Sequence, residues 1–224
     1  FDTVVAESDL TLLKFVPASG AATRMFKSLF SFLEEGKSDK SVDHFFENLN
    51  DFAFFNALEG ALANDGIAIG TADRKTIVQY FLTGLGLGYG YLPKGLLQFH
   101  AYENASRTPL EEHLVEAGLY AKAGGMANLH FTVSPEHRDK FEKHVVEKIP
   151  QYESKFGLKY FVSFSEQEAS TDTIAVNLDN SPFREKDGSL LFRPAGHGAL
   201  IENLSKLNAD VIFIKNIDNV VPDR

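Results

Sequence analysis

One carboxylate near the end of the chain has the sequence surroundings of a metal ligand. Residues 211–214 (VIFI) form a short apolar run that is typical of a buried strand. Asp218 follows this run within the motif Asn-Ile-Asp-Asn. Ligands of open α/β sheets bind beyond the carboxyl ends of the strands, where a carboxylate suits Mg²⁺ beside phosphates. The alternative is that Asn216, Asp218 and Asn219 only form a turn, as such residues usually do.

A loop near the start of the chain has the pattern of a phosphate-binding site. Residues 11–16 (TLLKFV) predict a strand, and small residues lead from it to Arg24 and a helix that begins near Met25. Such a loop can cradle a phosphate because free backbone N–H groups and the helix dipole face the anion. Loops of this kind also serve only to turn the chain tightly, so the pattern leaves both interpretations open.

Three further segments carry polar or glycine-rich features whose role the residues alone leave open. Lys94 follows Pro93, although a lone surface lysine is usually only solvated, so its role depends on its context. Gln167 comes shortly after an apolar run at residues 160–164 (YFVSF), which predicts a strand. A Gly-His-Gly turn at residues 196–198 leads into a helix predicted over residues 199–207, with leucines at core-facing spacing.

Together these segments resemble the UDP-sugar pyrophosphorylases, which are nucleotidyltransferases. The most specific match is the Pro-x-Gly-His-Gly turn at residues 194–198 followed by the strand that ends in Asn-Ile-Asp-Asn. Residues 19–24 (SGAATR) match the family's Gly-Gly-x-Gly-Thr-Arg loop, with Ser19 and Ala22 in place of two glycines. Glycine there lets the backbone approach the nucleotide closely, so these replacements bear on activity. The chain looks closest to a bacterial family of unknown function within this superfamily.

The resemblance implies an enzyme that joins a nucleoside triphosphate, with UTP favoured, to a sugar 1-phosphate. A sugar-phosphate oxygen attacks the α-phosphate and pyrophosphate leaves, while the protein aligns the reactants and neutralises charge. The implied cofactor is Mg²⁺, held by Asp218. The residues assigned to catalysis are Arg24, Lys94 and Asp218, and those assigned to nucleotide binding are Ala18, Ser19, Gly20, Ala21, Thr23, Gln167, Gly196, His197 and Asn216.

Two other functions compete with this one. The altered loop suits a non-catalytic module that binds a nucleotide or nucleotide-sugar, and complete loss of the site would leave a structural or interaction domain. Relatives in the superfamily continue past the Asn-Ile-Asp-Asn strand and add a sugar pocket and a second acidic metal ligand. Because only residues 220–224 follow here, we expect nucleotide binding without efficient turnover, and the chain could be the N-terminal part of a longer one.

The elements that must position these residues alternate along the chain. Residues 27–81 carry apolar side chains at helical spacing, so residues 28–92 are predicted to form a helical insertion whose aromatic stripe is core. The glycines of residues 83–90 (TGLGLGYG) have the wrong spacing for a dinucleotide fingerprint and predict a mobile loop. A strand at residues 129–133 is followed by a helix from Glu136, which Pro150 should end or kink and which should stop by Gly157.

The remaining pattern predicts the fold class. Asp187-Gly188 indicates a hairpin between strands at residues 173–176 and 190–192. The alternation of strands and helices predicts a mostly parallel sheet covered on both faces. With the resemblance, this becomes a single domain over residues 1–224 with a Rossmann-like, three-layer α/β/α nucleotidyltransferase (GT-A-like) fold.

Composition narrows the partners. The 224 residues suffice for one sizeable domain, and the net charge of -9 argues against nucleic acid and anionic membrane as partners. Cysteine is missing from the sequence, which excludes disulfides and thiolate chemistry. No apolar run approaches the roughly 18 residues of a membrane span, and no signal peptide is visible, so the expected location is the cytoplasm.

Overall fold

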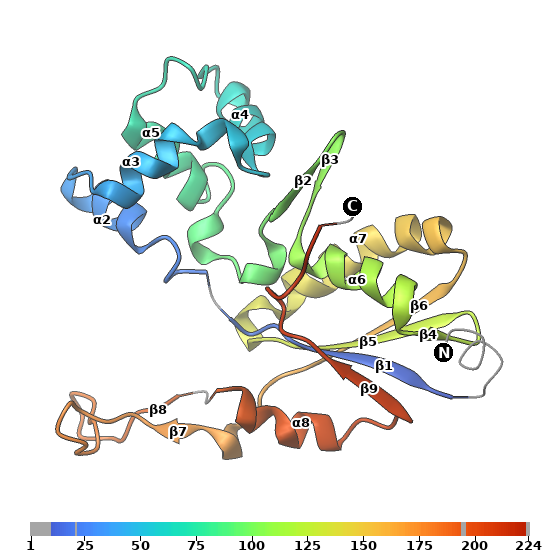
Figure 1. Ribbon diagram of the computed structural model, residues 1–224. Coiled ribbons are helices and arrows are strands. Elements are labelled where there is room, and N and C mark those ends of the chain that lie inside the picture. The colour runs from blue at the N-terminus through green and yellow to red at the C-terminus, as the bar shows by residue number, and fades with distance from the viewer. Residues whose placement is uncertain (1–9, 21, 194–195, 223–224) are drawn as a thin grey trace. The chain divides into compact units, whose positions relative to one another are not determined.

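The computed structural model describes residues 10–20, 22–193 and 196–222, which form two compact units (Figure 1). The first, here called the sheet unit, comprises residues 1–19 and 116–216. The second, here called the helical unit, comprises residues 20–115 and 217–224. The boundary therefore passes between Ser19 and Gly20 and between Asn216 and Ile217. The predicted insertion at residues 28–92 lies inside the helical unit.

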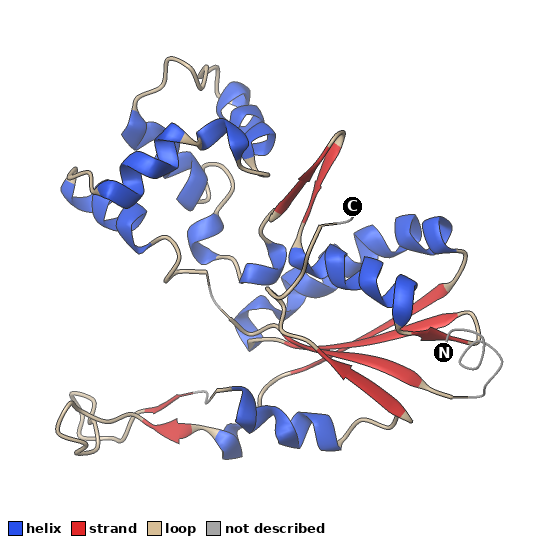
Figure 2. Ribbon diagram, viewed as in Figure 1, coloured by secondary structure: helices blue, strands red, loops and turns tan. Residues whose placement is uncertain are grey.

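The sheet unit contains a mostly parallel, five-stranded sheet curled into a half-barrel, so the mixed α/β class is as predicted (Figure 2). β6 and β1 run parallel to β5 on its two sides, β9 runs parallel to β1, and the short β4 pairs antiparallel with the start of β5. The strands are β1 Leu12–Pro17, β4 Lys122–Ala123, β5 Met126–Thr132, β6 Lys159–Ser165 and β9 Val211–Ile214.

Helices lie on both faces of this sheet. On one face, Phe141 of α7 (Arg138–Phe156) packs beside Phe131 and Phe164, with ring centroids 6.4 Å from each. On the other face, Leu200 forms a small core with Leu13 and Phe15. Leu200 ends a 3₁₀ turn that continues into α8 (Ile201–Ser205), so the predicted helix over residues 199–207 is shorter than expected. Alternate residues of β1 thus face different helices, as the pleat requires.

One local prediction needs correction. β9 is an edge strand in the described part of the sheet, and Val211 and Ile214 are 37% and 60% exposed, so it is not a fully buried strand. Of the two predicted effects of Pro150, an end to the helix is not seen: α7 runs on to Phe156, and Gly157 stops it in a left-handed conformation as predicted. The helix tolerates Pro150 because this residue is exposed, and the carbonyl of Val146 that loses its partner belongs to a residue 74% exposed.

The predicted hairpin is present as a short ribbon. β7 (Thr173–Ile174) pairs antiparallel with β8 (Phe192–Arg193). The predicted turn at Asp187-Gly188 forms, with Gly188 at φ 86° and the Asp187 carboxylate accepting the Ser189 N–H at 3.0 Å. A second turn of the same kind at Asn180 precedes it.

The helical unit is built from short helices and one small hairpin. Asp39 and Asp73 cap α3 and α5 by accepting backbone N–H groups of the first helical turns. Residues 109–115 of α6 belong to this unit, and residues 116–120 belong to the sheet unit. The elements are α2 Lys27–Glu35, α3 Lys40–Glu47, α4 Phe55–Asn64, α5 Arg74–Leu82, β2 His100–Tyr102, β3 Ala105–Arg107 and α6 Pro109–Tyr120.

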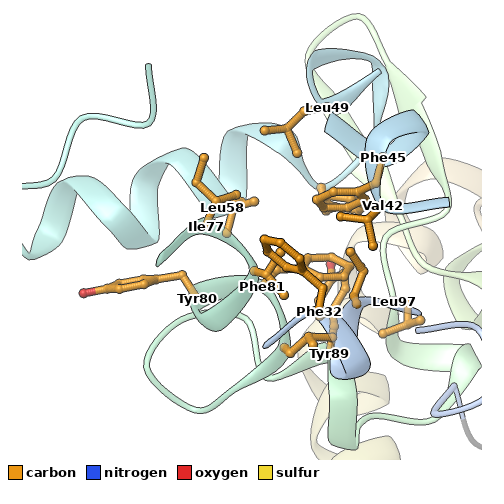
Figure 3. Packing of buried hydrophobic residues seen from close by; sticks show 14 of the residues in the cluster. Phe32, Val42, Phe45, Leu49, Leu58, Ile77, Tyr80, Phe81, Tyr89 and Leu97 are labelled. Atoms are coloured by element: carbon orange, nitrogen blue, oxygen red, sulfur yellow. The ribbon is translucent and has the colours of Figure 1, made fainter. Parts of the chain in front are cut away.

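An aromatic core holds the helical unit together, which confirms that the predicted stripe is core (Figure 3). The rings of Phe45, Phe54 and Phe81 form its centre, with centroids 4.6–6.2 Å apart. Residues 83–90 form turns and a 3₁₀ start rather than a dinucleotide fingerprint. A Cβ at Gly90 would come within 2.5 Å of the Phe30 ring, so the loop needs glycine for close packing. Within the described residues, no helix is long and apolar enough to cross a membrane.

Candidate functional site

Three of the predicted site residues come together in the helical unit. The Lys94 N–H donates to the Gly20 carbonyl at 3.1 Å, which ties the predicted phosphate loop (residues 19–24) to the segment after Pro93. Lys94 Nζ donates to Asp218 Oδ2 at 2.7 Å. Three motifs that are far apart in the sequence therefore contact one another through Lys94.

The ion pair between Lys94 and Asp218 is open to solvent. Their side chains are 29% and 39% exposed. An ion pair this exposed contributes only about 0–1 kcal/mol, so a phosphate could displace Asp218 from Lys94 at little cost. The neighbouring residue is fixed more firmly: Ile217 is 3% exposed, and its carbonyl lies 3.2 Å from Nε2 of the buried His113. The backbone next to Asp218 is thus anchored while its carboxylate remains accessible.

Asp218 is suited to bind Mg²⁺ only together with the phosphates of a nucleotide. Among the described residues, no group of three His, Cys, Asp or Glu side chains could hold a metal ion. Mg²⁺ is commonly bound through one or two carboxylates together with substrate phosphates and water. A single carboxylate beside the Lys94 ammonium meets that description once phosphates neutralise the lysine, so Asp218 suits a Mg²⁺–nucleotide complex better than free Mg²⁺.

The phosphate loop has an open helix end but fewer free N–H groups than a glycine loop. Thr23 and Arg24 are exposed and lie in turns before α2, which begins at Lys27 without a side-chain cap. This end of the helix can attract an anion. Ala22, however, is fully buried, and its N–H donates to the Leu92 carbonyl at 3.4 Å. Ala21 lies outside the described residues.

The first residues of the loop, in the sheet unit, have their backbone groups in use. Ala18 is fully buried, and its N–H donates to the Thr132 carbonyl at 2.8 Å. The Ser134 hydroxyl donates to the Ser19 carbonyl at 3.2 Å. These bonds fix the chain where it leaves β1, so Ala18 and Ser19 position the loop through contacts with the end of β5.

Other predicted residues follow the parallel strands of the sheet unit. Gln167 comes two residues after β6, and its Nε2 donates to Asp172 Oδ1 at 3.1 Å. Asn216 comes two residues after β9. Gly196 is exposed and leads into the 3₁₀ turn His197–Leu200. The side chain of His197 lies outside the described residues. Because the carboxyl ends of parallel strands share one edge, Gln167 and Asn216 lie at the same edge of the sheet as the start of the loop.

A polar network at this edge was not predicted from the sequence. Asn203 of α8 is 2% exposed, and its Nδ2 donates to the Ser165 hydroxyl at 2.8 Å and to the Glu166 carbonyl at 2.7 Å. Nε2 of His130 lies 2.8 Å from the same hydroxyl. Burial lowers the pKa of His130, which favours the neutral ring. The network fixes the end of β6 just before Gln167, and no local sequence signal marks its members.

A buried ionic cluster in the sheet unit was also missed. Lys14 of β1 is fully buried and donates to Glu116, which also accepts from Lys215 Nζ at 2.5 Å and from the Tyr120 hydroxyl at 3.0 Å. Burial lowers the pKa of Lys14 to about 8, although Glu116 acts in the opposite direction. Burial would raise the pKa of Glu116, but the hydrogen bonds from Lys14 and Lys215 outweigh it and hold this pKa below its ordinary value.

Fold and site together describe a mixed α/β protein with polar residues beyond the carboxyl ends of a mostly parallel sheet. The chain belongs to the family described as a domain of unknown function, DUF4301, whose model matches residues 2–224. The expectation of a family of unknown function is thus confirmed, while membership of the nucleotidyltransferase superfamily stays a prediction. Neither the curated proteins nor the solved structures give a match to this chain.

Proposed function

We propose that this protein is a Mg²⁺-dependent nucleotidyltransferase that makes a nucleotide-sugar from a nucleoside triphosphate, with UTP favoured, and a sugar 1-phosphate. The proposal includes the finer fold assignment, a Rossmann-like, three-layer GT-A-like domain. Its main support is the convergence of Gly20, Lys94 and Asp218, because the resemblance selects these residues from three separate motifs and Lys94 contacts both of the others.

In the proposed reaction, a sugar 1-phosphate oxygen forms a bond to the α-phosphorus, and the bond from that phosphorus to the pyrophosphate oxygen breaks. The chain's own cations, Arg24 and Lys94, offset the charge of the phosphates. Asp218 would hold Mg²⁺ once Lys94 pairs with a phosphate in its place. Bound Mg²⁺ would neutralise charge on the triphosphate and favour departure of pyrophosphate. The open helix start at Lys27 adds partial positive charge.

Recognition of the base is assigned to the sheet unit. By the resemblance, Gln167 and Gly196 would contact the base and His197 would shape the surface around it. Asn216 lies at the same sheet edge as Gln167. The Asn203 network supports this assignment, because buried hydrogen bonds fix the backbone immediately before Gln167. The proposed partners are therefore small phosphorylated molecules, and the proposed location is the cytoplasm.

The proposal is tested by binding and by product formation. Mg²⁺ with UTP should raise the melting temperature, and pyrophosphate should appear when a panel of sugar 1-phosphates is added. Mass spectrometry of the products would then identify the sugar. Lys94→Ala should reduce both signals, whereas Lys75→Ala, which removes an exposed cation of α5, should leave them unchanged. Equal responses of the two variants would contradict the role of Lys94.

A non-catalytic nucleotide-binding module is the second candidate, and one observation favours it. Ala22 occupies a position where the family has glycine. Its N–H already donates to the Leu92 carbonyl, so this N–H is not available to bind a phosphate. Fewer free N–H groups would leave the triphosphate less well oriented for attack. A clear thermal shift with Mg²⁺ and UTP, but no pyrophosphate with any sugar 1-phosphate, would identify such a module.

A further inference from the structure

We propose that the helical unit contains a second binding site, a cavity that takes a planar aromatic acid carrying an N–H donor. The cavity has a volume of about 600 Å³, which lies within the range of small-molecule sites. All its lining residues fall between Arg24 and Phe99, so it belongs to the helical unit alone. Its lining residues include the aromatic residues Phe26, Phe45, Phe52, Phe54, Phe81 and Tyr89.

The aromatic wall favours a flat ligand. Phe52 stacks on Phe45 and on Phe54, with ring centroids 5.5 and 5.0 Å apart and interplanar angles of 26° and 11°. Phe81 continues the wall with a tilted contact to Phe45 and an edge contact to Tyr89, at centroid distances of 5.3 and 5.2 Å, and Figure 3 labels these three residues. Aromatic rings prefer offset-stacked or edge-to-face neighbours, so a planar aromatic body extends this arrangement better than a branched aliphatic group does.

The polar residues around the cavity favour an anion. Arg24 and Lys27 are exposed and line it, whereas none of its described lining residues is acidic. This is notable in a chain whose net charge is -9. Residues 27–29, which also line the cavity, form the start of the nine-residue α2, which has no side-chain cap, so the helix dipole adds to the two cations.

Gln98 favours a ligand that carries an N–H donor. Its Oε1 is buried and lacks a hydrogen-bond partner in the described part of the chain, although its backbone N–H donates to the Tyr89 hydroxyl at 3.2 Å. A buried acceptor without a partner is unfavourable, and an N–H group of a ligand would satisfy it once the Gln98 side chain turns its amide toward the cavity that it lines. A flat apolar body, one donor and one acid group together describe an indole carboxylate or a compound of the same chemistry.

This site does not depend on the proposed nucleotidyl transfer. Arg24 and the start of α2 at Lys27 serve both proposals, but Phe52 and Gln98 have no role in the chemistry at Lys94 and Asp218. Variants of Phe52 and Gln98 should therefore leave the response to Mg²⁺ and UTP unchanged. If the wild-type protein did not bind a nucleotide, we would still expect the cavity to bind an aromatic acid.

The test uses the absence of Trp from the sequence, because an indole probe can then be followed by its own fluorescence. Indole-3-acetate should bind saturably. Gln98→Leu should weaken this binding about three- to tenfold, as expected for a lost hydrogen bond, but should not affect 1-methylindole-3-acetate, which has no N–H. Lys27→Ala should weaken indole-3-acetate by a similar factor and leave the uncharged indole-3-acetamide unaffected.

Two ring variants provide the matched control. Phe52 lines the cavity, whereas Phe55 packs on the same core without lining it. Phe52→Leu should weaken the probe, and Phe55→Leu should not, with thermal unfolding measured for both to confirm folding. Absence of saturable binding to the wild-type protein, or equal losses in the two variants, would overturn the proposal.

Discussion

Two lysine–carboxylate pairs, one in each unit, have the same chemistry and opposite surroundings. In the sheet unit, Lys14 is fully buried and bonds to Glu116, which holds Lys215 as well. In the helical unit, the Lys94 and Asp218 side chains are 29% and 39% exposed. Lys14 itself is not accessible to a ligand, whereas the exposed pair of Lys94 and Asp218 can separate at little cost.

The difference shows why ion pairing alone does not identify a functional site. Burial lowers the pKa of Lys14, which is a common property of functional lysines. Lys14 nevertheless already donates its hydrogen bond to Glu116 within the protein. The Lys94–Asp218 pair carries the functional argument instead, because it is accessible, lies against the phosphate loop through Gly20, and offers one cation and one anion to a Mg²⁺–nucleotide complex.

The largest expected effect is on the stability of the buried cluster. Glu116→Gln removes the charge that compensates both Lys14 and Lys215, and should lower the free energy of unfolding by about 3–5 kcal/mol. Urea denaturation would measure the loss. Lys14→Met is the control: it removes the buried cation and leaves Glu116 paired with Lys215, so it should cost far less. Similar losses for the two variants would contradict the view that Glu116→Gln destabilises the protein by leaving the Lys14 charge uncompensated.

The second effect is a pH dependence that belongs to Lys14. Its pKa is about 8 in the folded protein against an ordinary value of 10.5, so between these values the unfolded state binds more protons. The free energy of unfolding should therefore rise with pH across this window, by on the order of 2–3 kcal/mol from this group. Denaturation at pH 8 and pH 10 should show the rise in the wild type relative to Lys14→Met. Parallel behaviour of the two proteins would contradict the assignment.

The third effect concerns affinity at the exposed cations. Arg24→Ala should weaken binding of a nucleoside triphosphate by about 1–3 kcal/mol, as the loss of a charge-assisted contact does. Calorimetry would measure the change, with Lys37→Ala as a control because the Lys37 side chain is 84% exposed and lies beyond the end of α2. Unchanged affinity in Arg24→Ala would remove Arg24 from the phosphate site.

The smallest effect completes the contrast between the pairs. Lys94→Met should change the free energy of unfolding by less than about 1 kcal/mol, because an exposed ion pair contributes little. Urea denaturation of this variant beside Glu116→Gln gives the comparison directly. A loss of several kcal/mol would show that the Lys94–Asp218 pair is structural.

Elements with strong periodicity were predictable from the sequence, and contacts between distant residues were not. The apolar runs gave β1, β5 and β6 within a few residues, and the helical spacing gave α2–α5. The small β2–β3 hairpin was missed because its residues, HAYENASR, show no apolar alternation. β9 was predicted to be buried because composition cannot distinguish a central strand from an edge strand.

The sequence indicated which residues belong to the candidate site, but not the contacts between them. Resemblance to a family selected Gly20, Lys94 and Asp218, but nothing local indicated that Lys94 would contact both of the others. The Lys14–Glu116 bond joins residues 102 positions apart, so the run TLLKFV gave no sign that its lysine is buried. The aromatic stripe was correctly interpreted as core, yet the cavity within it depends on how the rings pack.

The most direct test of the central claim is the effect of Mg²⁺ on UTP affinity, measured by calorimetry in the wild type, Asp218→Asn and Asp51→Asn. Asp51 is an exposed carboxylate of the same unit and serves as the control. We predict that Mg²⁺ strengthens binding about tenfold or more, equivalent to roughly 1.4 kcal/mol, in the wild type and Asp51→Asn. Asp218→Asn should fold normally and lose this response. An equal response to Mg²⁺ in all three proteins would contradict the assignment of Asp218 and, with it, the proposed site.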